Sequence, residues 1–335
     1  MSRRSTLIVL MTVASLLLVS CGAAATPSPA AEEELRLAAI FPGVVTDADY
    51  NTLGYIGATE VESEMGIDMA YSESVAVPDV ERVMREYIDN DFNVIFTHGG
   101  QFFSQTQTLA EQNPDRYFIA EFDAPAEDAP DNFWVIDRNF HIGFYALGVL
   151  AGHLTETGRI GYLGGLTLPF SYAEVHAIEQ ALADEGLDGE VEVQPVWVGD
   201  FNDPTGAREL ADAMISDDVD VIIGSLNLGM LGVFEAAKSA EQTVYVTAKY
   251  TDKSNFAPDQ YVTSVLYDWA GPLTDIITNI QEGETGGYYP LGFDTGVSLQ
   301  EPQNVPDDVT QRVNEVVEQL RAGEIEVEKN TEPIE

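Results

Sequence analysis

The sequence predicts an α/β protein built from two similar, doubly wound lobes that are joined by a multi-strand hinge. Short apolar runs alternate with segments in which apolar residues recur at helical spacing, a pattern typical of parallel sheets with helices on both faces. The alternation begins near residue 35 and begins again near residue 140. Residues 135–160 contain no linker rich in Pro, Gly and Ser, which favours hinged lobes over the alternative of two independent domains on a linker.

The first half contains four apolar runs separated by helical patterns. Leu53, Val61 and Met65 lie on one apolar face of an expected helix. Pro78 stands at the first position of the next expected helix, where proline is favourable. The expected strands are 35–41, 67–71, 94–97 and 117–122, and the expected helices are 51–65, one from Pro78 to Ile88, and 104–112.

The second half repeats the alternation. The run Asp220-Val221-Ile222-Ile223 precedes Gly224-Ser225 much as Asn93-Val94-Ile95-Phe96 precedes His98-Gly99-Gly100, which indicates weak internal symmetry. The expected helices are 140–154, 172–185, 204–216 and 232–240, and the expected strands are 159–163, 191–198, 219–224 and 244–248.

The remaining residues are too few for a third domain. They contain expected strands at 261–267 and 296–299, expected helices at 270–281 and 306–321, and a closing segment at 323–328. We expect this tail to complete both lobes. The first lobe would then comprise residues 35–138 with about 268–290, and the second residues 139–267 with about 291–328. Hinged lobes of this kind close around ligands.

The N-terminus has the pattern of an export signal. Arg3 and Arg4 precede the uncharged run 6–20, which is short for a transmembrane helix of about 20 residues. The run Leu18-Val19-Ser20-Cys21-Gly22 resembles the bacterial lipobox, which implies cleavage before Cys21 and lipid on its thiol. The alternatives are a chance cysteine in an ordinary secretory signal and a signal anchor.

We therefore expect a lipoprotein signal peptide at 1–20 and a flexible tether at 21–34, rich in Ala, Pro, Ser and Glu. The mature protein would lie outside the cytoplasm, anchored to the cell membrane by lipid on Cys21. The chain has a single cysteine, so no disulfide within it is available.

The charge of the chain limits its partners. It has 15 Lys and Arg against 57 Asp and Glu, a formal net charge of −42. Such a surface repels nucleic acid and anionic lipid. The acidic residues are spread over the predicted helices, so they mark no site, and a salty habitat or a need for solubility would account for them.

No arrangement of residues points to catalysis. The sequence has no HExxH, no P-loop and no GxSxG elbow, and the glycines of 158–165 lie within and after a predicted strand. Asp47-Ala48-Asp49 is a lone pair of carboxylates in a loop. His98 ends a strand at the carboxyl edge of its sheet, where it is either a cleft residue or a structural histidine. We expect no enzyme activity, no metal and no cofactor.

Four stretches together resemble the basic membrane lipoprotein family of ABC-transporter substrate-binding proteins, whose known members bind nucleosides and purine bases. They are 157–165 (TGRIGYLGG), 200–204 (DFNDP), 229–238 (GMLGVFEAAK) and 263–265 (TSV). The resemblance covers roughly residues 35–300. It implies the type I periplasmic-binding fold, a purine-like ligand, ABC permease and ATPase partners, and a monomer.

The resemblance also implies a set of site residues. The family's first loop corresponds to Asp47-Ala48-Asp49-Tyr50-Asn51, in which Tyr50 would stack on a base and Asp47 and Asn51 would be polar contacts or helix caps. The further ligand-binding candidates are Gln101, Phe103, Asp123, Phe170, Asn227, Lys249 and Trp269.

Two departures from the family pattern bear on the ligand. At the position where the family has an Asp suited to ribose hydroxyls, this chain has Lys249 or Tyr250. The family also tends to have a Lys in the stretch that ends at Trp269 in this chain, and this chain has no Lys there. A base without sugar, or another flat heterocycle, is therefore favoured. Lys249 would pair with Asp123 or Asp268, or would meet an anionic ligand such as urate.

Three alternatives to the purine receptor stay open at this point. The protein could be a receptor for a sugar or other small polar solute, or a ligand sensor coupled to a membrane kinase. A secreted enzyme is the remaining alternative, and it would need a nucleophile or metal set that the sequence does not show.

Overall fold

The computed structural model describes residues 34–334, and the signal peptide, Cys21 and the tether up to residue 33 lie outside the described residues. The first sheet contains six parallel strands in the order β11-β5-β4-β3-β1-β2. Their bounds are β1 (Arg36–Ile40), β2 (Asp68–Ser72), β3 (Val94–Thr97), β4 (Tyr117–Phe122), β5 (Phe133–Asp137) and β11 (Gly287–Pro290).

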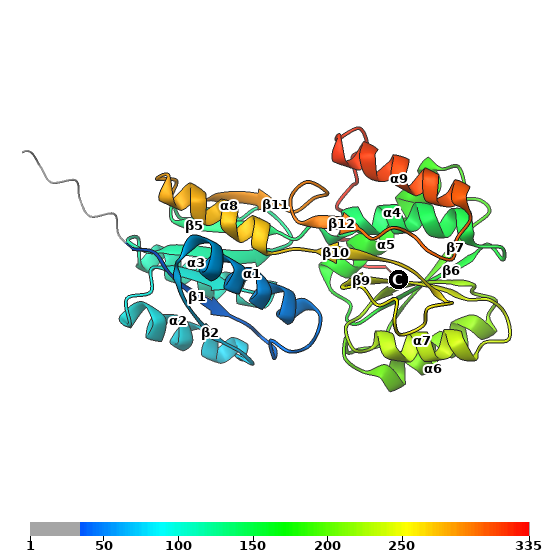
Figure 1. Ribbon diagram of the computed structural model, residues 1–335, viewed down its shortest axis with the longest axis horizontal. Coiled ribbons are helices and arrows are strands. Elements are labelled where there is room, and N and C mark those ends of the chain that lie inside the picture. The colour runs from blue at the N-terminus through cyan, green and yellow to red at the C-terminus, as the bar shows by residue number, and fades with distance from the viewer. Residues whose placement is uncertain (1–33, 335) are drawn as a thin grey trace, which may run out of the picture. The chain divides into compact units, whose positions relative to one another are not determined.

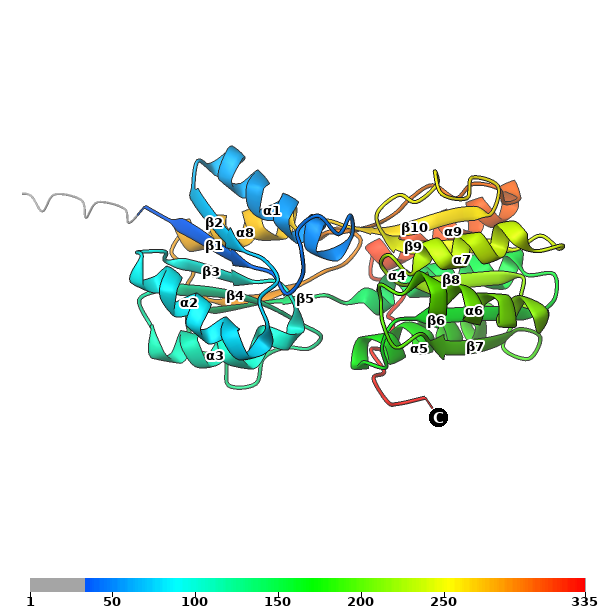
Figure 2. The ribbon, with the colours of Figure 1, turned by 90° about the horizontal axis from the view of Figure 1, so that it is seen from below.

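Helices cover both faces of this sheet, as Figure 2 shows. Leu37 and Ala39 of β1 belong to a core with α1 (Tyr50–Met65) and α8 (Ala270–Gln281). Ala38 and Ile40 point to the opposite face, where they join a core with α2 (Val80–Asp89) and α3 (Phe103–Gln112). Alternate residues of one strand therefore fill two cores, as expected for a strand buried on both sides. Two short 3₁₀ turns, Val77–Asp79 and Gly100–Phe102, precede α2 and α3.

The second sheet has the order β12-β10-β9-β8-β6-β7, and only β12 is antiparallel to its neighbour among the described strands. The strands are β6 (Arg159–Gly164), β7 (Glu192–Trp197), β8 (Val221–Ser225), β9 (Tyr245–Tyr250), β10 (Tyr261–Tyr267) and β12 (Val297–Leu299). In Figure 1, α4 (Phe140–Leu154), α5 (Pro169–Asp184) and α9 (Asp307–Arg321) lie on one face, and α6 (Pro204–Ser216) and α7 (Met230–Ser239) on the other. We call the parts built on the two sheets the N lobe and the C lobe.

Local sequence explains the ends of the helices. The Asp203 side chain accepts hydrogen bonds from the N–H groups of Thr205 (3.0 Å) and Gly206 (3.1 Å), and Pro204 occupies the first turn of α6. α1 ends at Gly66, whose φ of 69° is the left-handed conformation that glycine adopts without strain. α4 is apolar on nearly every side because it is buried under α5 and α9.

Three connections cross between the lobes within the described residues. They run from β5 to α4, from β10 to α8, and from β11 to β12. Residues after β10 thus return to the N lobe as α8 and β11, and the chain then goes back to the C lobe as β12 and α9. None of the helices in residues 34–334 has the length and apolar character that a membrane span requires.

Two strands, β5 and β11, are not among the elements expected from the sequence. β5 is a short apolar run that follows the segment 123–132, rich in Asp, Ala and Pro, and β11 is only Gly287-Tyr288-Tyr289-Pro290. Glycine and proline are depleted in strands, so the residues of β11 carry little strand signal. The two strands pair in parallel with each other, and β11 is the edge of the sheet, where a proline is tolerated.

Candidate functional site

A cavity of about 570 Å³ lies between the N lobe and the C lobe. Its walls come from residues that follow the carboxyl ends of strands in both sheets, where open α/β sheets bind ligands. Six aromatic rings line it: Tyr50, Phe122, Phe140, Phe170, Phe201 and Tyr250. Its volume is within the range of small-molecule sites. A wider hollow of about 680 Å³ on the outer face of α9 has polar walls such as Asp307 and Glu318 and contains no aromatic ring.

Four polar side chains face the same cavity: Gln101, Asp123, Arg138 and Asn227. Three of them belong to the N lobe, and Asn227, after β8, belongs to the C lobe. An apolar cavity with a few convergent polar groups is the ordinary form of a small-molecule site.

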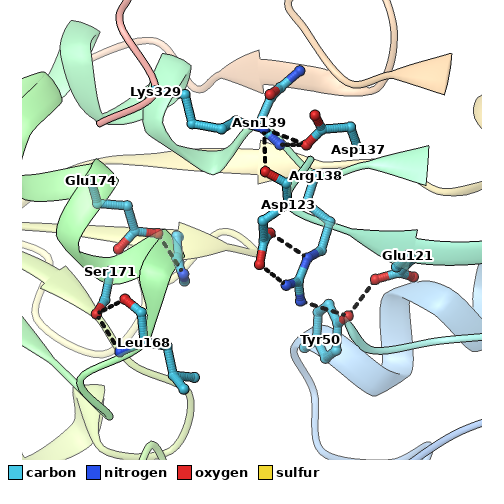
Figure 3. Close-up of polar contacts among 11 residues, drawn as sticks. Tyr50, Glu121, Asp123, Asp137, Arg138, Asn139, Leu168, Ser171, Glu174 and Lys329 are labelled. Atoms are coloured by element: carbon cyan, nitrogen blue, oxygen red, sulfur yellow. Dashed lines mark hydrogen bonds and ion pairs between the residues drawn. The ribbon is translucent and has the colours of Figure 1, made fainter. Parts of the chain in front are cut away.

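Tyr50, at the start of α1, is held by a buried polar network (Figure 3). Its hydroxyl donates to the Glu121 carboxylate and accepts a hydrogen bond from Arg138 Nη1 at 3.4 Å. The His98 ring stacks on the Tyr50 ring at 3.9 Å between centroids, and its Nδ1 pairs with Glu121. Burial raises the pKa of the Tyr50 phenol, and the Glu121 charge raises it further. The ring is therefore a fixed, neutral face of the cavity.

Arg138 and Asp123 form a two-pronged ion pair in the cavity wall (Figure 3). Arg138 Nε donates to one carboxylate oxygen of Asp123 at 2.9 Å, and Nη2 donates to the other at 2.5 Å. Burial acts to lower the pKa of Arg138, but the charges of Asp123 and Glu121 outweigh it, so the pKa lies well above its usual value. The cavity therefore offers a permanent guanidinium beside carboxylate acceptors, a geometry suited to planar polar groups.

Tyr250 has an unusual backbone conformation at the end of β9. Its φ is 76°, which a bulky side chain rarely adopts. The ring is buried, with centroids 5.7 Å from Tyr50 and 6.0 Å from Phe140. Strained backbone of this kind clusters at functional sites, where the surroundings hold it in place.

Five of the residues implied by the resemblance come together around the cavity. They are Tyr50, Gln101, Asp123, Phe170 and Asn227. The other five do not line it.

Asp47 and Asn51 organise the start of α1. The Asp47 carboxylate accepts hydrogen bonds from the N–H groups of Asn51 (3.1 Å) and Thr52 (3.0 Å) and from the Asn51 side chain (2.7 Å). These contacts are those of a helix cap, which was one of the two roles expected for this pair.

Phe103, Trp269 and Lys249 lie behind the walls. Phe103 stacks on the rear of Phe122 at 4.0 Å, and Trp269 packs edge-on against Tyr50 at 5.5 Å. Lys249 is fully buried and pairs with Glu174 at 3.0 Å, so the expected pairing with Asp123 or Asp268 is wrong. The sequence does not point to Glu174 as the partner, because α5 brings it to β9 only in the folded chain.

Arg138, Phe140 and Phe201 line the cavity, although none of them is among the site residues expected from the sequence. Arg138 and Phe140 follow β5, a strand that the sequence pattern does not reveal, so the sequence did not mark them as residues at the carboxyl edge of a sheet. Phe201 stands inside the stretch 200–204 and could have been found from its place after β7. Of Lys249 and Tyr250, the two residues expected at the position of the family's Asp, Tyr250 is the one that lines the cavity.

Two groups of contacts hold the lobes together at the cavity. Asp49, before α1, pairs with Lys253 and accepts a hydrogen bond from the Thr251 hydroxyl at 3.0 Å. Near the hinge, Lys329 Nζ donates to the Asp137 carboxylate at 2.5 Å and to the Asp123 carbonyl at 2.9 Å (Figure 3). Within residues 34–334, no group of three or more His, Cys, Asp or Glu side chains is placed to hold a metal ion.

Comparison with known proteins gives a family for this arrangement. The model of the Bmp family, described as "ABC transporter substrate-binding protein PnrA-like", matches residues 35–331. A purine-binding protein of Brucella abortus is 24% identical over 300 residues, covering 88% of this chain and 83% of that protein. A putative ABC transporter glucose-binding protein of Haloferax volcanii is 26% identical over 266 residues, covering 78% of this chain and 65% of that protein.

The fold has solved counterparts. The solute-binding protein of an ABC transporter system from Conexibacter woesei superposes with a TM-score of 0.73 at 22% identity, covering 89% of this chain and 100% of that one. This likeness confirms the type I periplasmic-binding fold. With the match of the family model over nearly the whole described chain, it follows that the protein belongs to the Bmp family of ABC-transporter substrate-binding proteins.

Proposed function

We propose that this protein is the lipid-anchored receptor of an ABC importer and that it binds a purine-like base or nucleoside in the cavity between its lobes. The observation that carries the proposal is the cavity itself, which is lined by six aromatic rings and four polar side chains. The name of the Brucella relative, a purine-binding protein, supports the same class of ligand.

The walls suit a flat heterocycle. Stacking of a base on an aromatic side chain contributes about 1–3 kcal/mol, and Tyr50 and Phe170 are held rigidly enough to supply such faces. Gln101 and Asn227 each offer a donor and an acceptor, and Arg138 offers donors only. These groups match the alternating donors and acceptors on the edge of a purine.

Release and delivery would use the two lobes. The contacts between Asp49 and Lys253 form only when the lobes lie as they do here, and a ligand in the cavity would favour this closed arrangement. The closed monomer would then dock on a permease whose ATPase drives import, while lipid on Cys21 keeps it at the outer side of the cell membrane. Loss of fatty-acid labelling in Cys21→Ser, with labelling of the wild type, tests the anchor.

A sugar receptor is the second candidate. The Haloferax relative is named as a glucose-binding protein, and the Asp123–Arg138 fork beside aromatic faces also suits the hydroxyls and apolar face of a pyranose. The purine proposal is preferred because aromatic rings outnumber polar side chains around the cavity.

Thermal unfolding of the chain from residue 21 separates the two candidates. Purine bases and nucleosides are expected to raise the melting temperature by about 5–10 °C at 100 times their Kd, and glucose is expected to have no effect. A shift with glucose and none with any purine would overturn the proposal. Phe170→Leu should reduce the purine shift, whereas the control Phe103→Leu, similarly buried but outside the cavity, should lower the melting temperature with and without purine and leave the purine shift unchanged.

A further inference from the structure

A fully buried ion pair lies behind the aromatic wall of the C lobe. Lys249 of β9 and Glu174 of α5 are both 0% exposed, and Nζ and Oε1 are 3.0 Å apart. The other carboxylate oxygen of Glu174 accepts a hydrogen bond from the Tyr162 hydroxyl at 2.6 Å. Neither charged side chain lines the cavity.

The Lys249 ammonium lies against the faces of rings that do line the cavity. It is 4.7 Å from the ring centroid of Phe140, 5.0 Å from that of Phe170 and 4.7 Å from that of Tyr250. All three distances are within the range of cation–π attraction. The ammonium also approaches Phe144, which is not a wall residue, at 5.6 Å.

We propose that Lys249 determines ligand specificity, because it makes the cavity select electron-rich heterocycles over electron-poor ones. It acts through the rings of Phe140, Phe170 and Tyr250. This inference goes beyond the proposed purine binding and rests on it.

The quadrupole of an aromatic ring explains this selectivity. Both faces of a phenyl ring carry partial negative charge, which opposes a second electron-rich ring stacked on it. A cation against one face draws the π electrons towards itself, so the other face becomes less negative. Three rings of the wall share one buried cation, and the stacking penalty for an electron-rich ligand falls at each of them.

The charged groups around Lys249 bear on this role. Burial lowers the pKa of Lys249 from the usual 10.5, and the Glu174 carboxylate opposes that change and so favours the charged ammonium. Arg138 places a second cation near the same rings, 5.3 Å from the centroid of Phe140 and 5.5 Å from that of Phe170. Phe140 and Phe170 therefore each contact two cations, one buried behind the wall and one in the wall itself.

The test measures the Kd of two purines of similar shape, the electron-rich diaminopurine and the electron-poor chloropurine. The double variant Glu174→Gln with Lys249→Met removes both charges, so it leaves no unpaired buried ion. The wild type is expected to prefer diaminopurine. The preference should fall by about fivefold in the double variant, the size of a moderate cation–π contribution, and Lys249→Arg should keep it.

Tyr162→Phe is the matched control, because it removes a partner of Glu174 while the ammonium stays against the rings. It should lose stability and keep the wild-type preference. An equal change of preference in this control, or an unchanged preference in the double variant, would overturn the role of Lys249.

The wild type alone provides a second measurement that does not depend on the folding of a variant. Affinity should rise along a series of substituted purines as their electron density rises, and a flat or reversed trend would overturn the inference while the proposed function stands. A wild type that binds no purine at all would overturn both.

Discussion

Lys253 of the C lobe and Asp49 of the N lobe form a buried ion pair that joins the two lobes beside the cavity. The Thr251 hydroxyl lies 2.9 Å from Lys253 Nζ and donates to the same Asp49 oxygen. Burial raises the pKa of Asp49, even though the Lys253 charge opposes it. The pair therefore exists at a desolvation cost, and each charge would regain water if the lobes separated.

Lys253→Met should favour the open arrangement of the lobes. It leaves Asp49 buried without its cation in the closed form, which costs on the order of 3 kcal/mol, whereas opening lets water solvate the carboxylate. We expect ligand affinity to fall by about tenfold or more and the radius of gyration in small-angle scattering to increase with ligand present. Lys238→Met, which removes an exposed ion pair on α7, is the control. Unchanged affinity and radius would contradict this role.

Tyr50→Phe should destabilise the protein although it removes a single oxygen. Glu121 is fully buried and would lose a hydrogen-bond donor, for which the cost is about 1–3 kcal/mol. Urea unfolding measures the change. Tyr55→Phe on the same helix is the control, because the Tyr55 hydroxyl makes no hydrogen bond to another described residue. A similar loss of unfolding free energy in both variants would show that the hydrogen bond from Tyr50 to Glu121 does not stabilise the protein.

His141 should make stability depend on pH. Burial lowers its pKa from 6.5 to about 4, and the Lys329 charge adds to this. A pKa depressed in the folded state contributes stability that is present above pH 6.5 and is lost as the pH falls through about 4.

The full contribution is about 3 kcal/mol, from 1.36 kcal/mol per pKa unit. Unfolding free energies at about pH 7 and about pH 4 are the measurement. The loss of unfolding free energy on acidification should be smaller in His141→Gln than in the wild type. An equal pH dependence in His141→Gln would refute the assignment.

Gly57→Ala should destabilise α1 in spite of the better helix propensity of alanine. A Cβ at Gly57 would lie 2.8 Å from the Trp269 carbonyl carbon and 2.9 Å from the Ala270 nitrogen, which are backbone atoms that cannot rotate away. The overlap should cost about 1–3 kcal/mol, more than the gain in propensity of about 1 kcal/mol. Thermal unfolding measures the effect, with Glu60→Ala at an exposed position of α1 as the control. A raised melting temperature in Gly57→Ala would be the contrary result.

The sequence was sufficient to predict the α/β class and most of the elements. Strands such as β3 and β8 are continuous apolar runs, and helices such as α9 have a clear polar face, so their periodicity is visible without any tertiary contact. β11 was missed because its strand character comes from pairing with β5, and this pairing is not written in the four residues themselves.

The site was predicted less completely, for a related reason. Tyr50 stands at the start of a recognisable helix and Asp123 directly follows a recognisable strand, so their place at the cavity could be anticipated. Lys249 stands at the end of a strand as well, but whether it faces the ligand or the rear of the wall depends on Glu174, which is 75 positions away in the sequence. A buried charged side chain must face a partner of opposite charge, and the pattern of a single sequence does not show which residue that partner is.

The place of β11 has a consequence for the order in which the chain can mature during synthesis. Gly287 pairs with Trp134, so the first sheet acquires its edge strand only after nearly the whole polypeptide has been made. Until then β5 presents unpaired backbone groups, the kind of edge that recruits other chains into aggregates. Premature termination anywhere before residue 287 would thus damage the half of the protein that was translated first.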